Sequence, residues 1–186
     1  WRPRPPGHVA CAAALPRLRF LLFLALLLPS PPAGVTAAAD SAPQCSAAFM
    51  AATRYGDMEQ LRASLKVEST RCINARAETP LHIAAWYGQL DAAILLLGAG
   101  ALMDRDHWGR TPLHFAAEAG EVEMTKTLLA SGAYIELPDD AQRTPLHHAA
   151  RRGRVDVIRL LLESGAVFEP LDSEQRAPLH YSCRGD

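Results

Sequence analysis

The sequence carries almost no net charge. Its 186 residues include 19 lysines and arginines against 20 aspartates and glutamates, for a formal charge of -1. This balance gives the chain no overall electrostatic attraction to nucleic acid or to an anionic membrane surface. Hydrophobic residues make up 49% and charged residues 21%, as in a folded globular protein. We therefore expect a protein partner and no nucleic acid.

Short motifs that carry enzyme chemistry are also missing. The chain has no G-x-x-x-x-G-K-[ST], no H-E-x-x-H and no G-x-S-x-G, so a nucleotide-binding loop, a zinc protease and a serine hydrolase are unsupported. The neighbouring carboxylates Asp139 and Asp140 fall at a predicted loop tip, where we expect solvated charge. The sequence predicts a protein that is not an enzyme, with no cofactor, no metal and no small-molecule substrate.

Cysteine is scarce, and no two cysteines are spaced as C-x-x-C. A zinc knuckle or a thioredoxin-like redox motif is therefore unsupported. The favoured interpretation is free thiols, and the alternative is a disulfide between Cys45 and Cys72, which requires an oxidising compartment. The four cysteines are Cys11, Cys45, Cys72 and Cys183.

The apolar run of residues 20–28 is too short for a membrane span, which takes about 20 residues. It follows several arginines and precedes small residues through Ala39, the layout of a secretory signal peptide. An organelle transit sequence is one alternative for residues 1–39, because the segment is rich in arginine and free of acids. A disordered leader without a targeting role is the other. We expect the secretory pathway if this leader is a true signal, and the cytoplasm otherwise.

One tetrapeptide recurs at a nearly constant interval. Thr79-Pro80-Leu81-His82 returns at Thr111, at Thr144 and, with alanine in place of threonine, at Ala177, at spacings of 32, 33 and 33 residues. Paired alanines and two glycines follow each of the first three motifs in the same phase, down to Gly153 and Gly165 in the third copy. A fixed period of this length indicates stacked copies of one structural unit.

The T-P-L-H-x-A-A motif at this period resembles the ankyrin repeat, and the resemblance covers about residues 46–186. It implies an all-α solenoid of stacked helix-turn-helix units with projecting hairpin loops, here preceded by the apolar leader. Threonine is a good N-cap and proline suits the first helical position. Glycines such as Gly88, Gly120 and Gly153 are placed to end the first helix in a left-handed turn. The second-helix stripes are predicted as Leu90, Ala93, Leu97; Val122, Thr125, Leu129; and Val155, Ile158, Leu162.

The repeat register predicts the domain boundaries. A linker at 40–45 leads into a degenerate capping repeat at 46–78, where Phe49 replaces the motif leucine and Gly56 the first glycine. Full repeats follow at 79–110, 111–143 and 144–176, and a truncated repeat at 177–186. Because the chain begins at Trp1 and stops inside a repeat, we expect it to be a fragment of a longer protein.

The motif histidines do not predict a metal site. Neighbouring repeats stack roughly 10 Å apart, so equivalent histidines are too distant to share one zinc ion at about 2.1 Å per bond. The resemblance implies a structural role instead, in which each histidine bonds the backbone and the threonine of its own turn. The four histidines are His82, His114, His147 and His180.

In ankyrin proteins the partner is usually held by hairpin tips and by exposed first-helix positions, which implies a binding surface in this chain. The aromatic residues gather toward the first full repeats and the arginines toward the later ones, so an aromatic anchor and a cationic stretch are predicted. The alternatives are ordinary surface packing of the tryptophans and a solvated arginine face. The predicted contact residues are Trp86, Tyr87, His107, Trp108, Arg110, Glu118, Asp140, Arg143, Arg151, Arg152 and Arg176.

The leading functional interpretation is a monomeric scaffold or adaptor that binds a protein in its concave groove. A second is the amino-terminal recognition arm of a larger enzyme, such as a kinase, an acyltransferase or a ubiquitin-ligase component. A third, which depends on the leader, is a secreted ankyrin effector. Fold by itself does not identify the partner.

Overall fold

The computed structural model describes residues 43–182. The predicted leader at 1–39, the first half of the linker (40–42), Cys11 and Cys183 lie outside these residues. Among the residues that are described, no helix is both long and apolar enough to cross a membrane.

The described segment folds into consecutive helix pairs, and its one backbone bridge joins Gln44 to Ile73. This confirms the predicted all-α solenoid. The first helices of the units are α1 (Ala47–Tyr55), α3 (Pro80–Tyr87), α5 (Pro112–Ala119), α7 (Pro145–Arg151) and α9 (Pro178–Ser182). The second helices are α2 (Met58–Leu65), α4 (Leu90–Gly98), α6 (Val122–Ala130) and α8 (Val155–Glu163).

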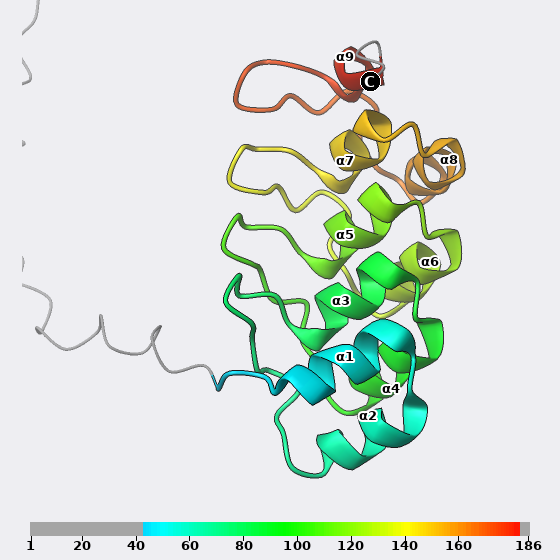
Figure 1. The fold of residues 1–186 in the computed structure, drawn as a ribbon. Coiled ribbons are helices and arrows are strands. Elements are labelled where there is room, and N and C mark those ends of the chain that lie inside the picture. The colour runs from blue at the N-terminus through cyan, green and yellow to red at the C-terminus, as the bar shows by residue number, and fades with distance from the viewer. Residues whose placement is uncertain (1–42, 183–186) are drawn as a thin grey trace, which may run out of the picture. The chain divides into compact units, whose positions relative to one another are not determined.

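The helices stand in two columns (Figure 1). The first helices α1, α3, α5, α7 and α9 form one column, and α2, α4, α6 and α8 form the other, while the long loops between units project to one side of the first column. Contacts run mainly between each first helix and the next, and between the two helices of one unit. Each unit therefore hides its apolar faces against its neighbours, as in other solenoids.

The T-P-L-H motif begins each full first helix as predicted. Thr111 is the N-cap residue and Pro112 occupies the first helical position, where its missing N–H costs no intrahelical bond. His114 reaches back to the cap, so that the two residues form a reciprocal capping box. At the other end of α5, Gly120 has φ 94°, a left-handed conformation that favours glycine.

The second-helix stripes were predicted slightly out of phase. The fully buried side chains of α6 are Met124, Thr125 and Leu128, whereas Leu129 is only half-buried, and Val155 at the start of α8 is 62% exposed. Each second helix faces the first-helix column along one line and its neighbouring second helices along another. The predicted leucines therefore lie between these two lines of contact, where their side chains are only partly buried. The corresponding buried sets are Ala92, Ala93 and Leu96 in α4, and Val157 and Leu161 in α8.

The amino-terminal unit, α1 and α2, is a helix pair that lacks the motif. Phe49 fills the leucine position and is fully buried, and Ser46 replaces threonine as the N-cap by accepting the Phe49 N–H at 3.1 Å. Cys45 and Cys72 form a disulfide with their Cα atoms 4.9 Å apart. This pairing favours the disulfide over free thiols for these two cysteines, and it ties the start of α1 to the loop that leads into the second unit.

Candidate protein-docking groove

The groove lies between the first-helix column and the hairpin loops, and backbone hydrogen bonds join the loop tips. The N–H of His107 donates to the Arg76 carbonyl at 3.2 Å, and that of Asp140 to the Trp108 carbonyl at 3.0 Å. The N–H of Ser173 donates to Ala141 at 3.1 Å. Because each tip is bonded to the next, the loops form one continuous wall.

A buried aspartate holds each full hairpin in shape. Asp139 Oδ1 accepts the backbone N–H of Ala141 and of Arg143, both at 2.9 Å, and its Oδ2 accepts Arg143 Nε at 2.9 Å. Burial opposes ionisation of Asp139, but hydrogen bonds from His148 and Arg143 outweigh it and hold the pKa of Asp139 well below its usual range. The expectation of a solvated carboxylate is wrong for Asp139, which is buried, and holds for its exposed neighbour Asp140. The same brace joins Asp106 to Arg110 and Asp172 to Arg176.

This pairing with loop aspartates gives three of the predicted contact residues a structural role. The guanidinium groups of Arg110, Arg143 and Arg176 are turned onto their own loop aspartates, at 2.7 to 2.9 Å. Arginines engaged in this way stabilise the loop and have little charge left for a partner. The sequence could not distinguish them from free arginines, because the pairing depends on the turn that the loop makes.

The predicted aromatic anchor divides into a packed part and an exposed part. Trp86 is half-buried and meets Phe115 edge-on, with ring centroids 6.0 Å apart. Trp108 is 48% exposed, and its ring centroid lies 4.8 Å from the Arg110 guanidinium carbon, which also lies 4.4 Å from the centroid of the Phe115 ring. Tyr87 is 40% exposed. The structure therefore leaves Tyr87 and Trp108 accessible and places much of Trp86 in the core.

The remaining first-helix residues of the prediction form a charge network. Glu118 was interpreted as exposed, but it is buried at 4% exposure beneath Arg151 and Arg152, whose guanidinium groups reach its Oε1 at 2.6 and 3.0 Å. Its other oxygen lies 3.3 Å from His148 Nδ1. Burial opposes the ionisation of Glu118, yet the bonds from His148 and Arg151 lower its pKa to about 2.

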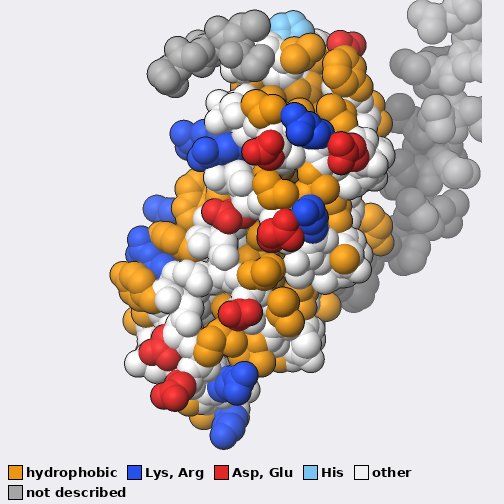
Figure 2. Space-filling model, turned by 90° about the vertical axis from the view of Figure 1, so that its right-hand side faces the viewer, with side chains coloured by type: hydrophobic (Ala, Val, Ile, Leu, Met, Phe, Trp, Pro, Cys, Tyr) orange, Lys and Arg blue, Asp and Glu red, His pale blue; other side chains and the backbone are white. Residues whose placement is uncertain are grey.

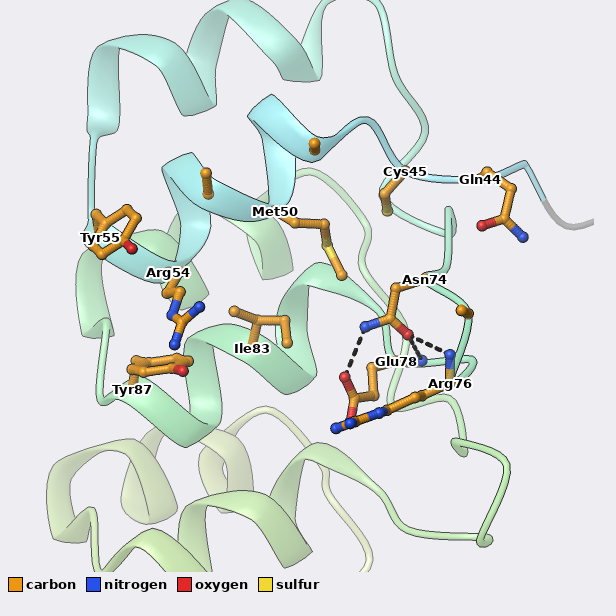
Figure 3. A pocket seen from close by; sticks show the side chains of 13 residues that line it. Gln44, Cys45, Met50, Arg54, Tyr55, Asn74, Arg76, Glu78, Ile83 and Tyr87 are labelled. Atoms are coloured by element: carbon orange, nitrogen blue, oxygen red, sulfur yellow. Dashed lines mark hydrogen bonds between the residues drawn. The ribbon is translucent and has the colours of Figure 1, made fainter.

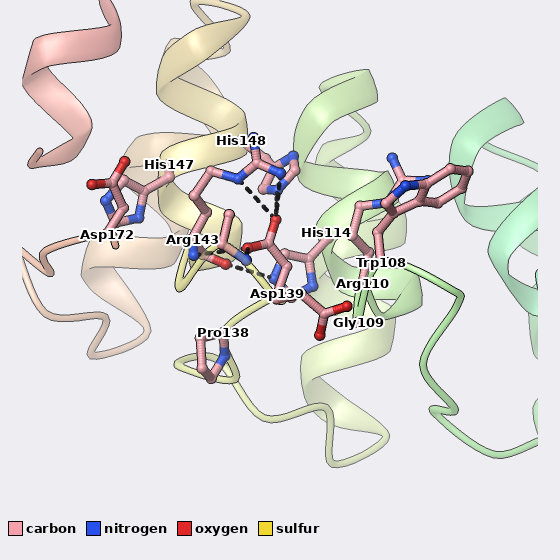
Figure 4. A network of polar contacts seen from close by, with 12 residues as sticks. Trp108, Gly109, Arg110, His114, Pro138, Asp139, Arg143, His147, His148 and Asp172 are labelled. Carbon is pink, nitrogen blue, oxygen red and sulfur yellow. Dashed lines mark hydrogen bonds and ion pairs between the residues drawn. The ribbon is translucent and has the colours of Figure 1, made fainter. Parts of the chain in front are cut away.

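His148 is the residue that the sequence interpretation missed. It is buried between Glu118 and Asp139, with Nε2 3.0 Å from Asp139 Oδ2 (Figure 4). A signal for it existed, since the equivalent positions of the two preceding repeats hold the apolar residues Ile83 and Phe115. An imidazole with a carboxylate at each ring nitrogen is a structural link between neighbouring units and the loop.

The motif histidines have the structural role that the resemblance implied. The Thr111 N–H donates to His114 Nδ1 at 3.0 Å, so the ring proton is on Nε2, which donates to the Arg143 carbonyl at 3.1 Å. Burial, assisted by the nearby His148, lowers the pKa of His114 to about 3. His82 and His147 make the equivalent bonds to the Arg110 and Arg176 carbonyls. Within residues 43–182 no three histidines, cysteines or acids are grouped to hold a metal ion.

At the amino-terminal end the groove deepens into a cavity of about 690 Å³ (Figure 3). Met50 of α1 and Ile83 of α3 line it, together with Arg54 and Tyr87 at one side and the loop residue Arg76 at the other. None of the predicted contact residues except Tyr87 lies here. The cavity needs two units and a loop, which a single repeat pattern does not reveal.

These features define a helical-repeat solenoid whose units present a continuous loop wall and a groove. A model of the ankyrin-repeat family, described as ankyrin repeats in three copies, matches residues 48–139 and 135–186. The chain belongs to the ankyrin-repeat family. A comparison with curated proteins gave no match. Ankyrin-repeat domains are in general protein-interaction modules and are typically not catalytic.

Proposed function

We propose that this chain is a non-catalytic scaffold or adaptor that holds a protein partner in the groove between its first helices and its hairpin loops. The observation that carries the proposal is the row of bonded loops beside the first helices, with Trp108 exposed on a loop and Tyr87 exposed on α3. Tyr87 and Trp108 offer large rigid surfaces, which are common among the residues that dominate binding energy. A groove held in shape before binding loses little entropy when a partner docks.

The predicted contact residues divide into two groups under this proposal. Tyr87, His107, Trp108 and Asp140 are exposed and would touch the partner directly. Trp86 and Glu118, together with Arg110, Arg143 and Arg176, would support the surface from beneath. Arg151 and Arg152 lie at the rim, where they already share Glu118 and would contribute less than free cations.

The surface formed by the second helices lacks the features of a binding site, and this contrast supports docking in the groove. Figure 2 shows acidic, basic and apolar side chains interspersed over this side, with no sign of charge dominant. A mixed surface of this kind keeps a protein soluble without marking a binding site. We propose a monomer, because the docking face is the groove and not this surface.

Photo-crosslinking tests which face docks. Benzoylphenylalanine placed at Tyr87 or at Trp108 of the full chain should capture a partner from cell extract, whereas the same residue at Ile94 should not. Ile94 lies on α4 and is 52% exposed, a close match to the 40% and 48% of the two groove positions. Capture that is equally strong from Ile94, or absent from both groove positions, would reject docking in the groove.

The Cys45–Cys72 disulfide favours one further candidate, a secreted ankyrin protein. Disulfides persist in oxidising compartments. In the sequence, a segment that resembles a secretory signal precedes the disulfide-bonded Cys45 and Cys72. Cells expressing the chain with a carboxy-terminal tag should release it into the medium. Peptide mapping after alkylation without reduction should then find the two cysteines joined. A tagged chain retained in the cytosol with both thiols alkylated would overturn this candidate.

A further inference from the structure

The cavity at the amino-terminal end of the groove combines an apolar floor with positive charge. Met50 and Ile83 supply the floor, and the Arg54 and Arg76 side chains line opposite walls (Figure 3). Arg54 and Arg76 are both exposed. The lining also includes one acid, Glu78, so the charges along the cavity leave an excess of one positive charge.

Arg54 is held in position by aromatic rings. Its guanidinium carbon lies 4.7 Å from the centroid of the Tyr87 ring and 5.8 Å from that of Tyr55. Figure 3 shows it beside the Tyr87 ring and facing the cavity. Stacking on a ring orients a guanidinium while leaving its N–H groups free to donate. Arg54 is therefore positioned to receive an acceptor from a partner.

Neither guanidinium of the cavity is neutralised by the chain itself. Along residues 43–182, no carboxylate lies within ion-pair distance of Arg54 or Arg76, whereas the loop and helix arginines farther along the groove are paired with acids. Glu78 is buried and already accepts Asn74 Nδ2 at 2.7 Å, with Arg110 4.0 Å away. Guanidinium groups without an acidic partner in the described chain thus line the cavity at the aromatic end, whereas the predicted arginines of the later repeats are paired with acids.

We propose that this cavity binds a protein segment in which an acidic residue lies next to a large apolar one. The apolar side chain would fill the floor over Met50 and Ile83, and a carboxylate beside it would bond to Arg54 on one wall or to Arg76 on the other. This proposal rests on the proposed protein-binding function and names the chemistry of the partner. Charge complementarity selects the occupant, because guanidinium groups bind carboxylates with directed, charge-assisted hydrogen bonds.

The other occupants fit less well. Residues 1–42 include four arginines and the single acid Asp40, so they carry the same sign of charge as the cavity. A nucleic acid would gain from a wide basic surface, which a nearly neutral chain does not provide.

The test uses the full chain and short fluorescein-labelled peptides in which leucine, methionine or phenylalanine adjoins a pair of glutamates. Matched peptides carry glutamine in place of each glutamate. Fluorescence polarisation should show that the acidic peptides bind at least about tenfold more tightly than the amide copies, as expected for hydrogen bonds to charged groups. The preference should shrink as salt is raised.

Substitutions of single arginines test whether the peptides bind in the cavity. Arg54→Gln and Arg76→Gln should each weaken binding of the best acidic peptide by about tenfold. Arg159→Gln, which removes an exposed and unpaired arginine from α8, should leave it within about twofold, the range of a remote charge. Thermal unfolding of each variant should match the parent chain, because these arginines are exposed.

The proposal is overturned if acidic and amide peptides bind alike, if no peptide binds, or if Arg159→Gln weakens binding as much as Arg54→Gln. Self-association of the chain that Arg54→Gln abolishes would identify a second copy as the occupant and also reject it. The proposal is also rejected if an oligonucleotide binds more tightly than the acidic peptides and its binding depends on Arg54 and Arg76. If only the proposed peptide chemistry is wrong, crosslinking from Tyr87 and Trp108 to a partner would still be observed. If the proposed protein-binding function is wrong, that crosslinking would be absent as well.

Discussion

Replacing His114 with leucine is expected to lower the free energy of unfolding by about 3 kcal/mol, because it leaves buried partners without hydrogen bonds. The imidazole accepts the Thr111 N–H at 3.0 Å and donates to the Arg143 carbonyl at 3.1 Å, in a site with no solvent exposure. Leucine fills similar space but offers neither bond. Urea denaturation followed by circular dichroism measures the loss.

The matched control is His180→Leu, the same change in the same motif at the last described unit. His180 is exposed, so its replacement should cost less than about 0.5 kcal/mol, the usual range for surface changes. Equal losses from the two variants, or no loss from His114→Leu, would show that the buried bonds do not stabilise the repeat.

The same variant has a second readout in the pH dependence of stability. Burial lowers the folded-state pKa of His114 to about 3, whereas the unfolded chain takes up a proton near pH 6.5. The stability contributed by the neutral ring is therefore complete above about pH 6.5 and is lost as the pH falls toward 3. The unfolding free energy of His114→Leu should decline less steeply over this range than that of the parent chain.

Replacing His148 with phenylalanine is expected to cost about 3 kcal/mol. Phenylalanine suits the fold at this position, since Phe115 occupies it in the preceding repeat. The loss arises because Glu118 and Asp139, which are 4% and 1% exposed, both lose a hydrogen-bond partner. Removing one member of a buried charged group is strongly destabilising.

A double-mutant cycle with Glu118→Ala identifies the cause. If the buried carboxylates account for the loss, His148→Phe should be less costly by about 1 kcal/mol or more in the Glu118→Ala background. Equal costs in the two backgrounds would mean that the loss does not arise from the contact between His148 and Glu118.

The T-P-L-H motif shows how much of the fold the sequence could predict. A threonine cap, a proline and a histidine lie within four residues of each other, so their bonds form inside one turn and repeat in every unit. The helix pair α1 and α2 was predictable for the same reason, from Phe49 and Gly56 in register. The phase of the second-helix stripes was not, because burial there depends on contacts with three neighbouring helices.

The candidate site was predictable only in part. Tyr87 and Trp108 were expected to be exposed, and they are. Arg143 and Glu118 were expected to be available, but a loop aspartate and two helix arginines engage them. Arg54, which has no carboxylate within ion-pair distance among the described residues, belongs to the amino-terminal helix pair, where the absence of the repeat motif hid its position.

By itself the sequence determined the repeat, its period, the start of each helix and the stacking of the units, because these follow from residues close together in the chain. Only the tertiary structure decided which charges neutralise one another. It also decided that Arg54 and Arg76 line one cavity without an acidic partner among the described residues. Glu118 and His148 are separated by 30 residues and meet because their helices are neighbours in the stack. Coulomb and hydrogen-bond energies depend on distances in space, and spacing along the chain does not give those distances.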